Sequence, residues 1–314
     1  MTSPKFAYRG RFAPSPTGPL HFGSLVAATG SFLEARACGG EWLLRVEDVD
    51  APRCSTEAAT GILRSLEACG FEWDGEVVWQ SRRTDAYAAA LERLKATGRV
   101  FPCACTRREL ADSAIAPDGA SIYPGTCRHG LAAGRVARAW RLRVGEARIC
   151  FDDAIQGWVE SDLAAEVGDF ILLRADGWFA YQLAVVVDDA AAGISHVVRG
   201  ADLLASTPRQ IFLQQCLDLP TPAYAHLPVV IDAAGEKLSK QTLAAAVDIS
   251  RPGPALFAAL EFLGQGPPGE LSNAPVEALW AWARACWRLD RVPRGPVAKA
   301  AVLGDNPSAT GEES

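Results

Sequence analysis

The sequence predicts an α/β fold in which a doubly wound parallel sheet is interrupted by an insertion and followed by a short helical region. Strand and helix patterns alternate over the first 100 residues, a segment rich in cysteine, glycine and arginine comes next, and apolar strand patterns then return. Strands that alternate with helices are typical of parallel sheets covered on both faces. The 314 residues, 49% of them hydrophobic, suffice to bury such a core.

The first half of the sheet is expected in residues 1–100. Its predicted elements are, in order, a strand at 6–14, a helix at 25–38, a strand at 41–46, and helices at 55–69 and 84–97. The second strand, with the run WLLRV, closes on the carboxylates Glu47 and Asp48. In a parallel sheet the carboxyl ends of the strands face the ligand site, so side chains at this position are candidates for binding.

The rest of the chain divides by composition into an inserted subdomain at 101–165, the second half of the sheet at 166–240, a helical subdomain at 241–290 and a disordered tail at 291–314. The returning elements are predicted as strands at 169–173, 181–187 and 196–198 and a helix at 208–217. Asp188 and Asp189 are expected to cap a loop after the second of these strands. The tryptophans at 280, 282 and 287, in the last predicted helix, are expected to pack in the core of the protein.

Composition limits the class of protein. No apolar stretch approaches the roughly 18–20 residues that a membrane span needs, and the N-terminus lacks an apolar signal core, so we expect a cytoplasmic protein without membrane contact. The net charge of −6 argues against a surface that coats nucleic acid, which leaves a local basic patch for any RNA contact. Nine cysteines cannot pair completely, and a close cluster in a reducing compartment favours a metal site.

The segment RFAPSPTGPLHFGS at residues 11–24 places His21 at the start of a predicted helix. Helix N-termini offer free N–H groups to phosphates, and Gly18 and Gly23 let the backbone approach an anion closely. An imidazole there can donate to a phosphoryl oxygen in the transition state. The alternative is a turn followed by a helix with a histidine cap.

A second segment, KLSKQ, carries Lys237 and Lys240 in a loop that follows a predicted strand. Taken alone, a lysine pair is typical of a solvated loop. Together, RFAPSPTG, HFGS and KLSK on an interrupted sheet resemble the class I aminoacyl-tRNA synthetases, whose signatures are the HIGH and KMSKS motifs. LLRVEDVD, AYQLAVVVDD and ISHVVRGADLL are similar to the glutamyl branch, and the resemblance runs from about Arg9 to Lys240.

The resemblance implies a Rossmann-like catalytic core that binds ATP, Mg²⁺ and L-glutamate. It implies catalytic roles for His21, Lys237 and Lys240 and ATP contacts from His21, Gly23, Ser24 and Lys240. It implies a glutamate site made of Arg11, Phe12, Ala13, Pro14, Ser15, Glu47, Tyr181 and Arg199. The residue types fit, because arginine forks bind carboxylates and Glu47 can bind the ammonium group. Surface ion pairs for Glu47 or Arg199, and core packing for Tyr181, are the alternatives.

The insertion contains FPCACTRREL and SIYPGTCRHG, in which Cys103, Cys105 and Cys127 can hold a tetrahedral structural zinc. The fourth ligand has two candidates. Spacing favours His129, whereas resemblance to the truncated members of the glutamyl branch implies Tyr123, which we expect. The alternative is three structural thiols without metal.

Three features set the chain apart from full-length glutamyl enzymes. HFGS ends in Ser24 and KLSKQ in Gln241, and 74 residues follow Lys240 in this chain of 314, too few for a large anticodon-binding region. We expect a monomer that forms glutamyl-adenylate without tRNA, because every residue proposed for this step lies within the chain. Resemblance to truncated members implies transfer of glutamate to queuosine in the anticodon of tRNA(Asp). Open alternatives are a short glutamyl-tRNA synthetase charging a 3′ end, a nucleotidyltransferase or acid ligase acting without RNA, and a catalytically inactive, zinc-stabilised RNA-binding module.

Overall fold

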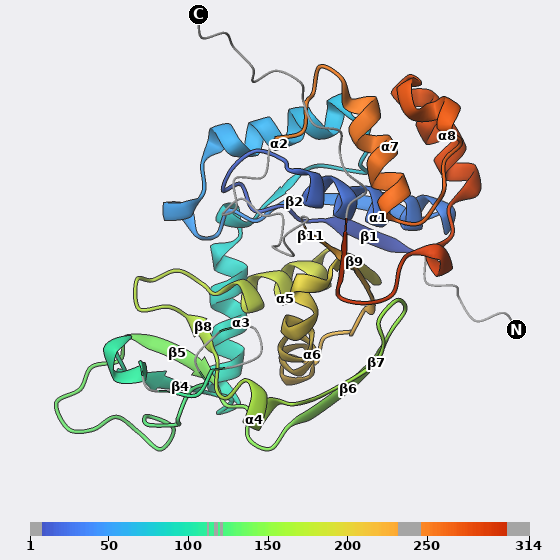
Figure 1. Ribbon diagram of the computed structural model, residues 1–314. Helices are drawn as coiled ribbons and strands as arrows, with labels where there is room; N and C mark the ends of the chain where they lie inside the picture. Colours follow the sequence, from blue (N-terminus) through green and yellow to red (C-terminus); the bar gives the residue numbers. More distant parts are fainter. Residues whose placement is uncertain (1–7, 112, 116–118, 120–121, 232–245, 300–314) are drawn as a thin grey trace, which may run out of the picture.

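The computed structural model describes residues 8–111, 113–115, 119, 122–231 and 246–299 and has the expected α/β architecture (Figure 1). The N-terminal part of the sheet consists of the parallel strands β1 (Arg9–Phe12), β2 (Glu41–Val46) and β3 (Val78–Trp79). β2 lies between the other two. The strand predicted at 41–46 is therefore confirmed, and the strand predicted at 6–14 is shorter at both described ends.

The second part of the sheet is built on β9 (His196–Gly200) and β10 (Ala223–Leu227), which are parallel. β10 also pairs with β6 (Arg148–Asp153), whose antiparallel partner is β7 (Gly157–Asp162). The backbone N–H of Ser195 donates to the carbonyl of Arg9 at 3.0 Å, which places β9 beside β1. The carboxyl ends of β1, β2, β9 and β10 consequently meet at one edge.

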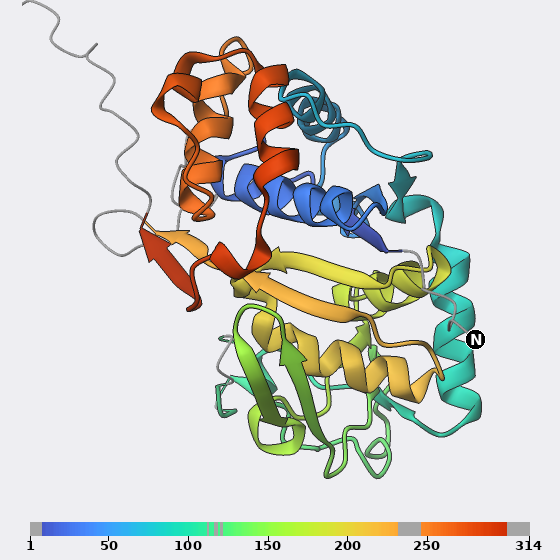
Figure 2. The ribbon, with the colours of Figure 1, turned by 90° about the vertical axis from the view of Figure 1, so that its right-hand side faces the viewer.

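Helices cover both faces of the sheet. α1 (Phe22–Ala37) lies between the strands and the C-terminal helices α7 (Pro252–Phe262) and α8 (Val276–Cys286), whereas α5 (Tyr181–Ala191) and α6 (Thr207–Cys216) lie on the opposite face (Figure 2). Two further helices are α2 (Thr56–Ala68) and α3 (Thr84–Ala96). Each face has its own buried apolar cluster. This arrangement is the doubly wound architecture that the sequence predicts.

The helix that carries the first histidine has clear local signals at both ends. His21 is its N-cap, and the ring accepts a hydrogen bond from the backbone N–H of Ser24. The helix ends before Cys38 and Gly39, and the glycine adopts a φ of +65°, a conformation that residues with a Cβ disfavour. The predicted helix at 25–38 is thus confirmed with a start three residues earlier.

A small antiparallel sheet joins β4 (Val100–Cys103) and β5 (Ala139–Leu142) with β8 (Ile171–Leu173), which lies beyond the insertion predicted at 101–165. The short helix α4 (Leu163–Glu166) follows β7. We expected the strand at 169–173 to rejoin the parallel sheet, and this was wrong, because β8 pairs with β5 instead. The boundaries proposed for the subdomains stay a prediction.

The strand predicted at 181–187 is wrong, because these residues form the first turns of α5. Leu183 to Val186 are all buried and apolar, so this part of the run shows neither alternation nor a polar helix face. A short apolar run of this kind does not distinguish a strand from a buried helix. Asp188 and Asp189 accordingly lie inside the helix and do not cap a loop.

The C-terminal helices pack onto α1 and α2 through tryptophan side chains. Trp280 Nε1 donates to the carbonyl of Cys69 at 2.8 Å, and Trp287 Nε1 donates to the carboxylate of Glu34 at 2.7 Å. Both indoles are buried and Trp282 is partly buried, so the predicted core role is confirmed.

The expectation of a disordered tail from residue 291 is wrong for its first part. β12 (Val297–Lys299) pairs in parallel with β11 (Val229–Ile231), the strand that follows β10 along the chain. Residues 300–314 lie outside the described part. Within the described residues, no helix has both the length and the apolar character needed to cross a bilayer.

Candidate active site

A cavity of about 240 Å³ opens where the carboxyl ends of β1, β2, β9 and β10 meet. It is lined by most of the residues predicted for ATP and glutamate: Arg11, Phe12, Ala13, His21, Gly23, Ser24, Glu47, Tyr181 and Arg199. Pro14 is buried and Ser15 is exposed, and neither lines the cavity. Lys237 and Lys240 lie outside the described residues. The structure therefore brings together residues far apart in sequence, while their individual roles stay predictions.

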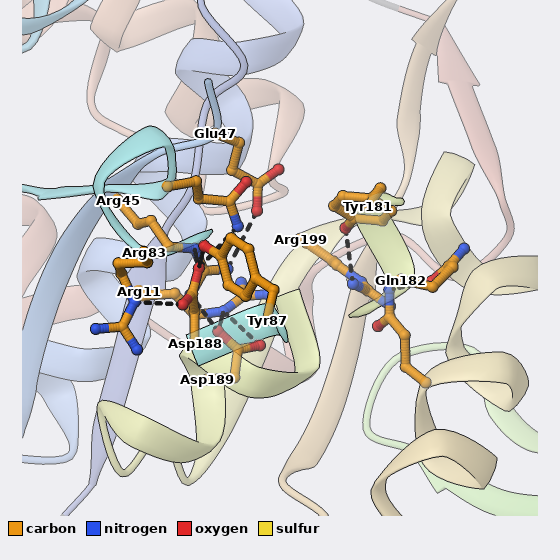
Figure 3. A network of polar contacts seen from close by, with 12 residues as sticks. Arg11, Arg45, Glu47, Arg83, Tyr87, Tyr181, Gln182, Asp188, Asp189 and Arg199 are labelled. Carbon is orange, nitrogen blue, oxygen red and sulfur yellow. Dashed lines mark hydrogen bonds and ion pairs between the residues drawn. The ribbon is translucent and has the colours of Figure 1, made fainter. Parts of the chain in front are cut away.

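One wall of the cavity rests on a buried ionic cluster (Figure 3). Arg11 Nε lies 3.2 Å from Asp189 Oδ1, and Arg45 Nη1 lies 2.6 Å from the same oxygen. Arg45 Nη2 donates to Glu47 Oε1 at 3.1 Å. Charges that are removed from water need such partners, because an unpaired buried ion is strongly destabilising.

Asp188 anchors this cluster to the neighbouring helix. Its carboxylate accepts hydrogen bonds from Gln80 Nε2 at 2.9 Å and from the hydroxyl of Tyr87 at 2.7 Å, and it pairs with the guanidinium of Arg83. Sequence reasoning assigned Asp188 and Asp189 to a loop and missed this network. Only their helical placement on the buried side of α5 reveals it.

The cluster sets the protonation of the two carboxylates that face Arg45. Burial raises the pKa of Glu47, although Arg45 and Arg11 oppose the shift. Burial would also raise the pKa of Asp189, but the nearby guanidinium groups of Arg11 and Arg45 outweigh it and hold this pKa below its ordinary value. Asp189 is thus a permanent anion at neutral pH.

The opposite wall carries Arg199, which is 6% exposed. Its Nη1 lies 3.4 Å from the hydroxyl of Tyr181 (Figure 3), its Nη2 donates to Thr207 Oγ1 at 2.9 Å, and its Nε donates to His226 Nε2 at 3.1 Å. Among the described residues, every hydrogen-bond partner of Arg199 is uncharged, including the Leu203 carbonyl, which Nη2 contacts at 3.5 Å. The guanidinium charge is therefore available to a ligand.

His21 lies at the third side of the cavity, where α1 begins. Its Nε2 lies 3.0 Å from Ser24 Oγ, so the two residues of the HFGS segment orient each other. Ala246 forms a β-bridge with His21, and Val247 N–H donates to the carbonyl of Leu20 at 2.9 Å. Val230 lines the cavity and Ala246 pairs with His21, a residue of its wall, so these two described residues lie near the cavity on either side of the lysine-bearing segment.

The three cysteines of the insertion form a separate cluster. The sulfur atoms of Cys103, Cys105 and Cys127 all lie within 4.8 Å of one another. The hydroxyl of Tyr123 lies 3.5 Å from Sγ of both Cys103 and Cys105 and accepts from the backbone N–H of Cys127 at 2.7 Å. His129 is exposed and does not belong to this group. Three thiol donors in one place fit the chemistry of a zinc ion.

Comparisons with known proteins agree with this geometry. A family described as tRNA synthetases class I (E and Q), catalytic domain, matches residues 7–255. A protein of Aromatoleum aromaticum named glutamyl-Q tRNA(Asp) synthetase is 64% identical over 307 residues, which are 96% of this chain and 97% of that protein. The chain belongs to the glutamyl-Q tRNA(Asp) synthetase family of class I synthetases.

Two further comparisons extend this result. A glutamyl-Q tRNA(Asp) synthetase of Dechloromonas aromatica is 62% identical over 94% of this chain and 97% of that protein. The crystal structure of a glutamate-tRNA synthetase from Elizabethkingia anophelis superimposes with a TM-score of 0.78 at 24% identity, over 93% of this chain and 68% of that one. The second match establishes a shared fold. The class I resemblance that the motifs indicated is confirmed.

Several residues of this class I synthetase site escaped sequence reasoning. Asp202, Leu227, Pro228, Val229 and Val230 are among the further residues that line the cavity. Val229, Val230 and the residue after them form β11, so the apolar run PVV that precedes KLSKQ in the sequence was the available signal.

Proposed function

We propose that this protein activates L-glutamate with ATP and transfers the glutamyl group to queuosine in the anticodon of tRNA(Asp). The proposal draws on family membership, since close relatives carry the name glutamyl-Q tRNA(Asp) synthetase. The observation that carries it is a charge pattern: the guanidinium of Arg199, which has no acidic partner among the described residues, and the carboxylate of Glu47 line the same cavity. An amino acid with a side-chain carboxylate complements both.

In this proposal Arg199 binds the side-chain carboxylate of glutamate, with the Tyr181 hydroxyl beside it. Glu47 receives the ammonium group, and Arg11 contributes a second guanidinium at the cavity wall. Glutamine offers no negative charge to Arg199 and would leave a buried cation unpaired, at roughly 3–5 kcal/mol. Discrimination against glutamine of about two to three orders of magnitude follows.

ATP is assigned to the start of α1, where His21, Gly23 and Ser24 line the cavity. Lys240 and Lys237 are proposed to reach the phosphates, because Val230, before their segment, lines the cavity and Ala246, after it, pairs with His21 in the cavity wall. Bound Mg²⁺ would share the phosphate charge. His21 is proposed to donate to the α-phosphate as negative charge builds there.

A structural zinc ion is proposed for the insertion, held by Cys103, Cys105, Cys127 and Tyr123. The position of the Tyr123 hydroxyl beside two of the sulfurs supports this ligand over His129. A site filled by four protein ligands leaves no position for substrate and stabilises the local fold.

The test is to incubate the protein with labelled glutamate, ATP and one of three RNAs: tRNA(Asp) with queuosine, tRNA(Asp) without it, and tRNA(Glu). Labelling confined to the queuosine-containing tRNA is the expected result. Preferential labelling of tRNA(Glu) would identify a short glutamyl-tRNA synthetase instead. Glutamate-dependent ATP–pyrophosphate exchange without tRNA should also occur, and its absence would overturn the proposed activation step.

A further inference from the structure

A buried row of three polar side chains, Asp153, His226 and Arg199, runs from the insertion to the wall of the cavity. Asp153 is the last residue of β6, His226 lies on β10 and Arg199 lies on β9. Asp153 Oδ2 is 2.6 Å from His226 Nδ1, and Arg199 Nε is 3.1 Å from His226 Nε2. The side chains of Asp153 and His226 are 0% exposed, so water does not compete for these bonds.

The partners of His226 fix the position of its proton. A guanidinium has donors only, so Arg199 Nε donates and His226 Nε2 must carry a lone pair. An ionised carboxylate has acceptors only, so Nδ1 carries the proton and donates to Asp153. Asp153 Oδ1 also accepts from the backbone N–H groups of residues 155, 156 and 226, which stabilises its ionised form. His226 is therefore a neutral imidazole with a single tautomer.

We propose that Asp153 and His226 are positioning residues that aim the guanidinium of Arg199 into the cavity without adding a negative charge against it. A carboxylate at position 226 would also hold Arg199 Nε, but it would neutralise the guanidinium and compete with a substrate carboxylate. A neutral acceptor gives the orientation without the competition. The inference rests on the proposed function, in which Arg199 binds glutamate.

The orientation is over-determined by the surrounding contacts. Thr207 Oγ1 accepts from Arg199 Nη2 and lies 3.1 Å from His226 Nε2, so it braces the same face of the guanidinium. Tyr181 contacts Nη1 from the cavity side. With Nε held by the imidazole, the guanidinium plane is fixed and the remaining N–H groups are directed toward Tyr181 and the ligand.

Two substitutions of His226 separate its role in orienting Arg199 from its role in packing. In His226→Gln the amide can occupy the place of Nε2 and accept from Arg199, whereas in His226→Asn the amide occupies the place of Nδ1 and leaves Arg199 Nε without a partner. We expect the KM for glutamate in pyrophosphate exchange to rise about 10–100-fold in His226→Asn and by less than about threefold in His226→Gln. The KM for ATP should stay within about twofold in both variants.

His196→Asn is the matched control, since His196 lies on β9 but stacks on Tyr8 with ring centroids 4.1 Å apart, away from the cavity lining. It should leave the KM for glutamate unchanged. If His226→Asn also leaves it unchanged, or if His226→Gln is as impaired as His226→Asn, the positioning role is wrong. If the wild-type protein shows no glutamate-dependent exchange, the proposed function fails instead, so the two failures are distinguishable.

Asp153→Asn tests the tautomer directly and keeps the ring in place. Asparagine Oδ1 can still accept from the backbone, but its amide N–H donates to Nδ1, which moves the histidine proton to Nε2, opposite Arg199 Nε. We expect nitrogen NMR of the imidazole to show an Nδ1–H tautomer in the wild type and Nε2–H in the variant. The KM for glutamate should rise about tenfold or more. A wild-type Nε2–H tautomer, or a normal KM in a variant that has switched tautomer, would overturn the proposal.

Discussion

The two arginines that line the cavity are held in opposite ways. Arg11 contacts Asp189, an anion that also pairs with Arg45, so its charge is compensated inside the protein. Arg199 is comparably buried but is held by an imidazole, a hydroxyl of threonine and a phenol. The comparison indicates that Arg11 belongs mainly to the architecture of the site, whereas Arg199 supplies the charge that a ligand neutralises.

The difference follows from what burial does to a cation. A guanidinium removed from water loses hydration, and a neighbouring carboxylate returns part of that free energy. Arg199 receives neutral hydrogen bonds but no counter-charge from the described residues, so a substrate carboxylate gains a strong interaction there. Selectivity for a negatively charged side chain is the expected consequence.

The largest expected effect is that of Arg199→Ala on catalysis. Loss of this guanidinium should lower kcat/KM for glutamate about 10³-fold, or roughly 4 kcal/mol, with a small change in the free energy of unfolding because its described partners are neutral. Exchange kinetics and urea unfolding measure the two quantities. A variant that binds glutamate normally would assign the substrate carboxylate to another group.

Arg11→Ala should lower the free energy of unfolding more than Arg199→Ala does. Asp189 and Glu47 would keep only Arg45 as a close cation, so we expect the free energy of unfolding to fall by about 3 kcal/mol. Urea unfolding of Arg11→Ala beside Arg199→Ala makes a matched pair. Equal losses of stability in the two variants would contradict the contrast between a compensated and an uncompensated arginine.

The sequence predicted the residues that line the cavity but not the buried side chains that hold Arg199. Arg11, His21 and Glu47 lie in contiguous motifs at strand ends, where local pattern and the geometry of parallel sheets place them in a ligand site. Asp153 and His226 are 73 residues apart and meet only because β6 pairs with β10. No periodicity records which buried polar atoms will face each other across a sheet.

The same limit explains the misplaced elements. The run at 181–187 is valine-rich because α5 is buried between the sheet and its neighbours, and local propensity favours a strand for such residues. The segment 171–173 has strand character, but its choice between two sheets depends on partners that are distant in the chain. Tertiary packing decided both cases.

The dependence of stability on pH should separate the two arginine clusters. Burial is the main cause that lowers the pKa of His226, from 6.5 to about 4, with Arg199 acting in the same direction and Asp153 opposing it. As the pH falls, His226 takes up a proton in the unfolded chain before it does so in the folded protein. The stability that the neutral His226 contributes is therefore complete above pH 6.5 and is lost as the pH falls from 6.5 to 4. Asp189 has a lowered pKa, and its contribution is lost only below its ordinary value of 3.8.

We therefore expect the free energy of unfolding of the wild type to fall by roughly 2–3 kcal/mol more than that of His226→Gln as the pH drops from 6.5 to 4. The other three histidines are common to both proteins, so the difference isolates His226. Urea unfolding at a series of pH values measures it. Parallel curves for the two proteins would show that His226 is not kept neutral by the fold.

The smallest expected effect concerns the cysteine cluster, which tests whether the contrast between the arginines is local to the cavity. The proposed zinc ligands contact neither Arg11 nor Arg199. Removal of zinc by chelation should therefore change the KM for glutamate by less than about twofold. It should nevertheless lower the melting temperature of the insertion, since metal binding there is coupled to folding.

Metal analysis should find one zinc per chain. His129→Ala should retain this zinc, and Tyr123→Phe, which lacks only the hydroxyl, should bind it more weakly. Loss of zinc in the histidine variant alone would exclude Tyr123 as a ligand, and a large rise in KM on chelation would show that the insertion controls the orientation of Arg199 through more than Asp153.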